Sequence, residues 1–412
     1  MKNYMLLFAC VGCMRLSAEA CNGREDFCDK RYNEIFGQVR IHNAASYFDP
    51  RTLRSLMKSS IMYVYPNPVA DQSIPFQEQL NDDRIPRLYP RVFKFPLHPV
   101  EKNGVRRVWT SHTLSYREFE EKFDHNKYAQ ALAPWLREKI RTFIKQDVLW
   151  RIDATNMPFL DILQQLKEFL DTHKSEVVTL SLNIFDLTLD EFVAVFKESG
   201  IYPYIHVQDL NQAWPTLREL IDLNKRLIIF QDEYRIRADS PDTHVAALVK
   251  QYPWITGFLW SDDFIFGNRY GFADLEKLEN DFCDILNDNY IRDQAAYQNK
   301  DRKPENKIFD LSHTVTPGWA ADKKITEKAN RYDVLVAHIK RCYESLGMLP
   351  NTVTLDFYDS DPGCLVAVSD VCNQPGCDES SLRSCVDCAP AIRLPGNFSD
   401  TCPAESREKS EL

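Results

Sequence analysis

Glycine and positive charge are the two things this sequence has little of. It contains 13 glycines among 412 residues, and none of them are spaced as in a phosphate-binding loop or a dinucleotide fingerprint. Its 60 Asp and Glu outnumber its 50 Lys and Arg, which gives a formal net charge of −10 at pH 7. These shortages argue against a glycine-rich nucleotide site and against a nucleic-acid partner held by overall charge.

Long apolar runs are also missing after residue 20, so the sequence predicts no membrane span there. Before that point, Lys2 precedes the apolar run Met5–Met14, and Ala18-Glu19-Ala20 has the small-x-small pattern of a cleavage site. We therefore predict a signal peptide over residues 1–20 and a secreted protein. The last four residues, Lys409-Ser410-Glu411-Leu412, are close to a retrieval signal, so retention in the endoplasmic reticulum lumen is the alternative.

The cysteine count fits the secretory route. Removal of the signal peptide takes away Cys10 and Cys13 and leaves ten of the 12 cysteines, an even number that suits pairing in an oxidising compartment. We expect a small bridge between Cys21 and Cys28. The sequon Asn397-Phe398-Ser399 predicts N-glycosylation at Asn397.

Residues 371–412 form a tail whose composition differs from the rest of the chain. The tail is rich in Pro, Ser and Asp and is too short for a core of its own, so we expect disulfides to hold it. With five cysteines, it must pair at least one of them outside the tail, and Cys364 is one candidate; the connectivity stays open. The tail cysteines are Cys372, Cys377, Cys385, Cys388 and Cys402.

Short β-branched runs alternate with amphipathic helical patterns over residues 21–370. Several runs are apolar throughout, which is typical of strands buried on both faces. This alternation predicts an α/β fold, a TIM-type (β/α) barrel, with residues 116–146 as a charged, aromatic insertion. The expected strands are Gln38–His42, Arg91–Phe95, Arg106–Trp109, Val177–Asn183, Arg226–Asp232, Lys307–Leu311 and Thr352–Phe357. The expected helices are Phe159–Leu170, Thr188–Lys197, Trp214–Leu223 (with Pro215 in its first turn) and Ala329–Leu346.

The strongest local feature is a histidine at the end of the first strand. The run Val39-Arg-Ile-His42-Asn43 places an imidazole at the carboxyl edge of the sheet, where barrels build their active sites. Histidine can take or give a proton at neutral pH. A histidine alone at a strand end is also a common structural residue, so this feature needs the rest of the chain.

An ordered set of segments over residues 21–370 resembles the secreted phosphatidylinositol-specific phospholipase C-like phosphodiesterases, whose catalytic barrel is the PLC X domain. The set keeps the order and spacing of one such barrel. The segments are Cys21–Gly23, Phe27–Tyr32, Ile41–Ala44, Asp71–Leu80, Phe169–Leu180, Trp214–Asp222, Lys225–Phe230 and Pro350–Asp356.

The resemblance implies cleavage of a phosphodiester by two histidines. One takes a proton from the inositol 2-hydroxyl, which attacks phosphorus, and the other protonates the leaving lipid alkoxide. His42 falls on the first histidine and Asn43 on the asparagine that follows it. For the second histidine, one alignment selects His112 and makes residues 116–146 an insertion, whereas a gap-free alignment puts Gln146 there. We favour His112 because it ends a strand-like run.

The resemblance also suggests substrate-binding residues. Arg91 is the expected phosphate cation, with a surface role as its alternative. Asp232 and Asp356 end later strands, where they can polarise a histidine or contact inositol hydroxyls; helix capping explains them nearly as well. His313 follows a strand as a family histidine does.

Three functions compete. The leading one is a secreted phosphoric diester hydrolase that acts on a phosphoinositide-type or GPI-type lipid head group at a transient membrane surface. The second is a catalytically inactive relative that serves as a binding protein. The third, a metal-dependent barrel diesterase, needs carboxylates beside His42. The second strand offers no carboxylate for calcium, so we assign no cofactor.

Overall fold

The structure is a computed structural model. It describes residues 20–41, 44, 72, 75–81, 90–102, 104–110, 130, 133–139, 142, 157–268, 271–281, 283, 306–316, 321–346, 349–360, 369 and 373. Residues 1–19 of the predicted signal peptide, most of the insertion and nearly all of the cysteine-rich tail lie outside these residues.

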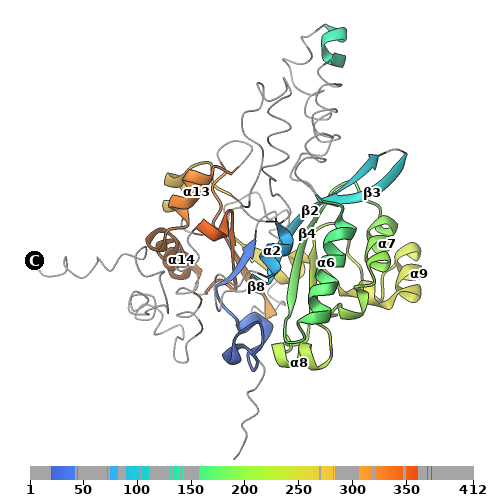
Figure 1. Cartoon of the computed structure of the whole chain (residues 1–412), viewed down its shortest axis with the longest axis horizontal. Coiled ribbons are helices and arrows are strands. Elements are labelled where there is room, and N and C mark those ends of the chain that lie inside the picture. Colours follow the sequence, from blue (N-terminus) through green and yellow to red (C-terminus); the bar gives the residue numbers. More distant parts are fainter. Residues whose placement is uncertain are drawn as a thin grey trace, which may run out of the picture.

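One twisted sheet of mainly parallel strands forms the centre of the molecule (Figure 1). Its order is β6-β5-β4-β2-β1-β9-β8-β7, and each neighbouring pair in this order that forms a ladder is parallel. The bounds are β1 Gln38–Ile41, β2 Val92–Lys102, β4 Val178–Ile184, β5 Leu227–Gln231, β6 Phe258–Trp260, β7 Ile265–Gly267, β8 Ile308–Ser312 and β9 Thr352–Leu355.

The predicted α/β fold with a parallel sheet is confirmed, in the form of a half-barrel. Within the described ranges no ladder joins β6 to β7, so the strands do not close into a ring. The expected strand over 106–109 is present as β3 (Val105–Thr110), but it runs antiparallel to β2. This β2–β3 hairpin projects from the sheet (Figure 1).

Helices cover one face of the sheet, the outer face, over both halves of the half-barrel (Figure 1). α7 begins after a capping box between Thr188 and Glu191 and ends at Gly200, whose φ of +69° suits glycine. A second capping box, between Thr216 and Glu219, starts α8 at Leu217, so Pro215 lies before the helix rather than in its first turn. The helices are α2 Phe76–Leu80, α6 Phe159–Thr172, α7 Leu189–Ser199, α8 Leu217–Asp222, α9 Thr243–Gln251, α10 Ser261–Phe264, α11 Leu275–Glu279, α13 Lys323–Ala329 and α14 Tyr332–Leu346.

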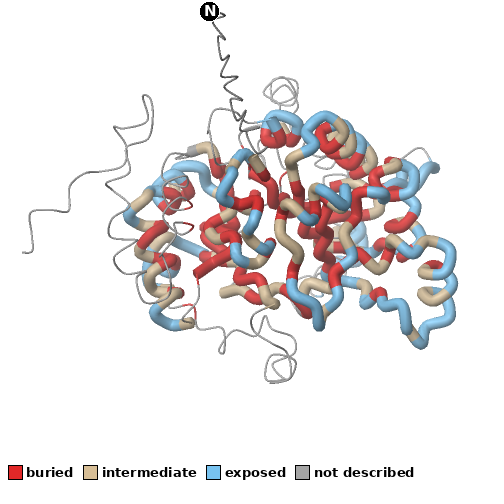
Figure 2. Tube along the Cα trace, turned by 90° about the horizontal axis from the view of Figure 1, so that it is seen from below, coloured by how far each residue is buried: buried red, intermediate tan, exposed pale blue. Residues whose placement is uncertain are grey.

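The main core lies between the sheet and these helices. The apolar stripe predicted for residues 159–170 is buried in α6 and packs on outward-facing strand residues such as Leu180 and Leu182. Buried residues concentrate in the strands and exposed ones on the outer helices and loops (Figure 2). None of the helices in the described part is long and apolar enough to cross a membrane.

The N-terminal segment, residues 21–36, closes the amino-terminal edge of the sheet. The expected bridge between Cys21 and Cys28 is confirmed. Asn22 exchanges two hydrogen bonds with the backbone of Val177, just before β4 begins. At the other end of the segment, Asn373 Nδ2 donates to the Phe36 carbonyl over 2.7 Å, so this residue of the C-terminal tail also packs at this edge.

Candidate functional site

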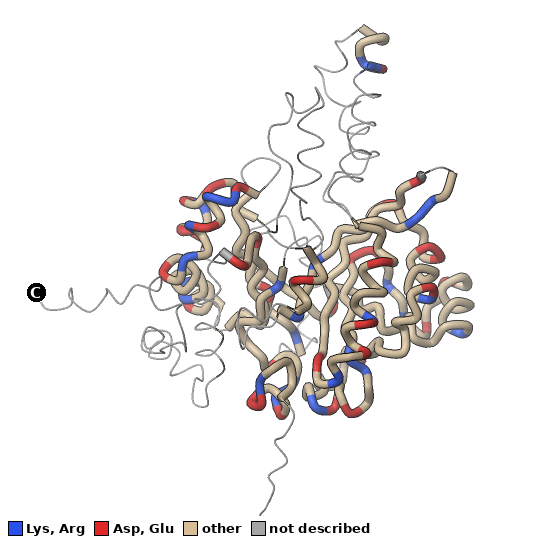
Figure 3. The backbone as a smooth tube through the Cα atoms, in the orientation of Figure 1, with Lys and Arg blue, Asp and Glu red and all other residues tan. Residues whose placement is uncertain are grey.

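Polar side chains line the inner face of the half-barrel, opposite the helices. Arg40 on β1 reaches across the sheet in two directions: Nη2 donates to Ser181 Oγ over 2.5 Å, and Nη1 forms an ion pair with Asp310. Asp310 Oδ1 also accepts hydrogen bonds from Thr352 and Thr354 of β9, at 2.6 and 2.8 Å. Figure 3 shows that Lys, Arg, Asp and Glu positions occur in the central strands as well as along the outer helices. The inner face therefore holds an organised polar network.

Of the cations on this face within the described residues, Lys94 lies nearest the carboxyl edge. It follows Phe93, which pairs with Ile41, the last residue of β1. Burial is the main reason that the pKa of Lys94 falls to about 7; Arg40 lowers it further, and Asp310, Asp232 and Asp356 oppose the fall. The lysine thus sits among carboxylates and changes charge near neutral pH.

Asp232 directly follows β5 and is bound to the end of β4. Its Oδ1 accepts a hydrogen bond from the Ile184 N–H over 2.9 Å, and Oδ2 accepts one from Asn183 Nδ2 over 2.5 Å. Burial raises the pKa of this carboxyl, while the hydrogen bonds and the charge of Lys94 lower it. Asp232 caps a strand end rather than a helix, and its carboxylate belongs to the carboxyl edge as predicted.

Asp356 directly follows β9 and is fully buried. It comes after Leu355, which pairs with Ile41, the residue before His42 in the chain. Its backbone carbonyl accepts a hydrogen bond from Asn330 Nδ2 over 3.0 Å, which holds this strand end against α13. Lys94, Asp232 and Asp356 therefore form one charged group at the carboxyl edge, which we call the carboxyl-edge cluster.

The two predicted catalytic histidines lie outside the described residues. His42 and Asn43 follow the last residue of β1, and β3 ends at Thr110, two residues before His112. Gln146, the alternative to His112, and the sequon residue Asn397 also lie outside. Their roles stay predictions.

Arg91 lies at the opposite edge from the one expected. It precedes β2, and its buried guanidinium is held by Glu176 (Nε to Oε2, 2.6 Å) and by the carbonyls of Leu80 and Pro90. It also stacks over the ring of Phe169. Arg91 therefore forms a structural ion pair at the amino edge of the sheet. Its contacts do not support the predicted role as the phosphate cation.

His313 follows β8 as expected, but its ring faces away from the inner surface. Its Nε2 donates to the Ala329 carbonyl over 2.9 Å, and Nδ1 lies 2.8 Å from Nδ1 of His338. Burial and the neighbouring His338 lower the pKa of His313 to about 3. The imidazole therefore belongs to a buried network behind the sheet and does not line the inner face.

The sequence analysis missed Lys94, Arg40 and Asp310. The signal was present, because each is a single charged residue within an otherwise apolar strand: Val39-Arg40-Ile41, Phe93-Lys94-Phe95 and Phe309-Asp310-Leu311. Alternation along a strand puts such a residue on the face opposite its apolar neighbours. A strict two-residue period would have placed all three on the inner face.

Among the residues that the structure describes, one group has the composition of a metal site: Asp281, Cys283, His338 and Cys342. It lies behind the sheet and not on the inner face, since His338 contacts His313. On the inner face, the carboxylates of Asp232 and Asp310 already accept hydrogen bonds from neighbouring side chains.

Comparison with protein families places the resemblance in the middle of the chain. The family model described as PI-PLC X 1 matches residues 146–265, from before α6 to the first residue of β7. The resemblance inferred from the sequence is confirmed for this part. The match begins after His42 and His112, so it includes neither histidine.

Individual proteins agree with the family match. The chain is 45% identical over 75 residues to PI-PLC X domain-containing protein 1 of Arthroderma benhamiae. That alignment covers 17% of this chain and 25% of the relative.

Two solved structures align over more of the chain at low identity. The phosphatidylinositol-specific phospholipase C from Listeria monocytogenes has a TM-score of 0.46 and 10% identity, covering 86% of this chain and 100% of its own. A mutant of the enzyme of the same name from Staphylococcus aureus has a TM-score of 0.42 and 12% identity, covering 80% of this chain and 88% of its own.

Proposed function

We propose, from the premise that residues 146–265 match the PI-PLC X family, that this chain is a phosphoric diester hydrolase. Its substrate is a phosphoinositide-type or GPI-type lipid, and His42 and His112 are the base and the acid. The observation that carries the proposal is the carboxyl-edge cluster. Lys94 supplies a cation on the inner face, next in register to the end of β1, where His42 follows.

A phosphodiester needs such a cation because negative charge builds up on the phosphoryl oxygens during attack. In the proposed reaction His42 removes the proton of the inositol 2-hydroxyl, and the resulting alkoxide attacks phosphorus. Lys94 neutralises the phosphoryl oxygens in place of the predicted Arg91. His112 donates a proton to the lipid alkoxide as the bond to phosphorus breaks. The products are a cyclic inositol phosphate and a lipid alcohol.

The carboxylates of the cluster have complementary tasks in this proposal. Asp356 follows the strand that pairs with β1 on one side, and it orients His42 and stabilises its protonated form. Asp232, fixed by Asn183 and Ile184, accepts hydrogen bonds from inositol hydroxyls. Because Lys94 on β2 neutralises the phosphoryl oxygens, the proposed reaction needs no metal ion on that strand.

The cellular setting is also a proposal. We propose that residues 1–20 are removed, that the protein is secreted with Asn397 glycosylated, and that it meets its lipid transiently at a membrane surface. Two disulfides in the described part, Cys21–Cys28 and Cys283–Cys342, support an oxidising route. Retention in the endoplasmic reticulum through Lys409–Leu412 is the alternative, and localisation of a chain lacking those four residues tests it.

The function is tested by incubating the purified chain with vesicles that contain phosphatidylinositol and measuring water-soluble inositol phosphate. Release that disappears in His42→Ala supports the hydrolase. Vesicle binding without release, unchanged in His42→Ala, would instead support the catalytically inactive binding protein.

A further inference from the structure

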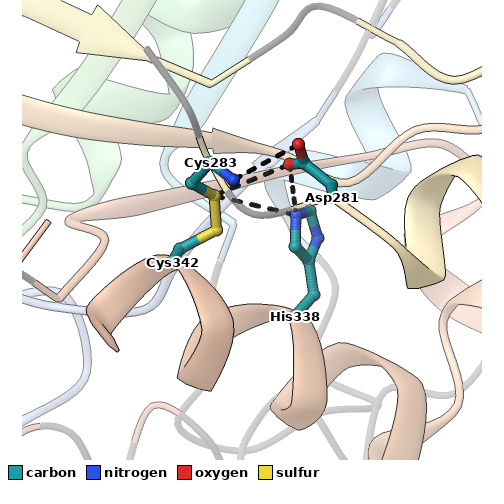
Figure 4. A group of neighbouring side chains, drawn as sticks. All are labelled: Asp281, Cys283, His338 and Cys342. Carbon is teal, nitrogen blue, oxygen red and sulfur yellow. Dashed lines mark hydrogen bonds and ion pairs between the residues drawn. A yellow bond between two sulfur atoms is a disulfide. The ribbon is translucent and has the colours of Figure 1, made fainter. Parts of the chain in front are cut away.

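Four ligand-type side chains form the compact group shown in Figure 4. The group lies behind the carboxyl ends of β7 and β8, because Asn268 after β7 contacts Asp281 and His313 after β8 contacts His338. Asp281 and Cys283 come from the loop after α11, and His338 and Cys342 lie one turn apart on α14. One ligand atom from each lies within 4.8 Å of the other three. The two cysteines form a disulfide. His338, Cys283 and Cys342 have no solvent exposure, and the Asp281 side chain is 13% exposed.

The hydrogen bonds of this group demand a positive charge at one point. The Ala329 carbonyl can only accept, so His313 Nε2 carries a hydrogen and, in the neutral ring, His313 Nδ1 is an acceptor. His338 Nδ1 must then donate to it. This leaves His338 Nε2 as a bare lone pair, 2.9 Å from Oδ2 of Asp281, which is also an acceptor. Two acceptors at this distance need a cation between them, either a proton or a metal ion.

The sulfur distances around that point are near those of a tetrahedral metal ion, whereas Nε2 and Oδ2, 2.9 Å apart, must separate by about 0.4 Å to share one. Zinc bound by sulfur, nitrogen and oxygen sets its ligand atoms roughly 3.3–3.8 Å apart. Cys283 Sγ lies 3.9 Å from His338 Nε2 and 3.6 Å from Asp281 Oδ2. In the oxidised protein the two sulfurs are bonded to each other and are poor ligands, so a proton occupies the gap between Nε2 and Oδ2.

We propose that Asp281, His338 and the thiolates of Cys283 and Cys342 form a zinc site when the disulfide is reduced. A dithiol or phosphine reductant supplies two electrons, and the two sulfurs take up two protons as the S–S bond breaks. Binding of Zn²⁺ then releases the thiol protons and the proton held between His338 and Asp281. Disulfide and zinc are thus alternative ways to fasten the loop after α11 to α14.

The surroundings are those of a supported ligand set. His313 fixes the ring of His338 with Nε2 directed at the site, and Asn268 Nδ2 donates to Asp281 Oδ2 over 2.9 Å. Two thiolates and one carboxylate around Zn²⁺ leave a net charge of −1. Arg341 donates from Nε to the Asp281 carbonyl over 2.9 Å, so its guanidinium is close enough to offset that charge.

The test is cobalt uptake, because tetrahedral Co²⁺ with thiolate ligands absorbs visible light and reports ligand type directly. The full chain is treated with a phosphine reductant without oxygen and titrated with Co²⁺, beside an oxidised sample. We expect the reduced chain to bind one more Co²⁺ than a Cys283→Ser/Cys342→Ser variant. The oxidised chain is expected not to form that species, and added Zn²⁺ should displace it.

Two variants separate this site from the other cysteines and from misfolding. Cys21→Ser/Cys28→Ser removes the other described disulfide and should keep the extra cobalt. Asp281→Asn lets its amide donate to His338 Nε2 but puts that amide opposite Asn268 Nδ2, so we expect a less stable chain. In the fraction that circular dichroism shows to be folded, cobalt affinity should fall at least tenfold. Equal uptake by wild type and Cys283→Ser/Cys342→Ser overturns the proposal. Unchanged affinity in a folded Asp281→Asn chain, or no uptake once thiol counting shows that Cys283 and Cys342 are reduced, also overturns it. None of these readouts depends on lipid hydrolysis.

Discussion

Lys94 is an ionisable residue between two apolar residues of a buried strand. A lysine between two phenylalanines on a buried strand loses its hydration, and this cost lowers its pKa to about 7. The three nearby aspartates limit the fall. Below pH 7 Lys94 of the free protein is charged, and above pH 7 it loses that charge, whereas Arg40 on the same face stays a cation.

Substitution of Lys94 tests its role as the phosphate cation. We expect Lys94→Met to lower kcat/KM about 10²–10³-fold, the usual effect of removing one electrostatic stabiliser. In the wild type, kcat/KM should fall as the pH rises through about 7, because the free protein then loses the lysine proton. The measurement is a pH profile of inositol phosphate release.

Lys94→Arg is the matched control, since guanidinium stays charged across this range. It should move the alkaline fall in kcat/KM to higher pH while some activity remains. An alkaline limb that stays in place in Lys94→Arg would assign that limb to another group.

At the scale of elements, the Arg91–Glu176 ion pair joins β2 to the loop before β4. Both side chains are largely buried, and the pair is completed by two backbone carbonyls. Breaking a buried pair leaves one charge without a partner, which costs far more than a surface pair is worth.

Arg91→Met should therefore lower the free energy of unfolding by about 3–5 kcal/mol, measured by urea denaturation. The kcat/KM of the folded variant should stay within about twofold of wild type, and Glu176→Gln should behave in the same direction with a smaller loss. A tenfold drop in kcat/KM for Arg91→Met, with Glu176→Gln unaffected, would restore Arg91 as a phosphate ligand.

The elements also show what the sequence could predict. Continuous apolar runs such as Leu227–Phe230 correctly indicated buried parallel strands, and α6 followed its apolar stripe. β6 and β7 were missed because each has only three residues, too few for a period to be visible.

The same reasoning explains the outcome at the candidate site. Asp232 and Asp356 were found because a carboxylate that closes a mainly apolar run marks a strand's carboxyl end. Arg91 was misplaced because it precedes its strand, and His313 because alternation turns it outward after Ser312. Only spatial contacts revealed that Arg40 reaches past β2 to Ser181 on β4 and past β9 to Asp310 on β8.

At the scale of the whole molecule, the N-terminal segment (residues 21–36) covers the amino-terminal edge of the sheet. Besides Asn22, Tyr32 reaches the inner face there, with its hydroxyl 2.7 Å from Thr179 Oγ1. The half-barrel therefore has one edge covered by its own chain and the other edge carrying the charged cluster.

Asn22→Ala should weaken this closure. It removes both hydrogen bonds to Val177 and puts alanine at a φ of +49°, so we expect a loss of about 2–4 kcal/mol in unfolding free energy. Asn22→Asp keeps the acceptor for the Val177 N–H and should lose less. Equal stability of Asn22→Ala and wild type in urea would show that the segment contributes little.

The central claim is that His42 and His112, together with the carboxyl-edge cluster, cleave a lipid phosphodiester. The most direct measurement is phosphatidylinositol hydrolysis by the purified chain, with and without a chelator, together with His42→Ala and His112→Ala. The account predicts chelator-resistant release of inositol phosphate that each substitution abolishes. No release from wild type on phosphatidylinositol or GPI-anchored substrates, or release that survives His42→Ala, would contradict it.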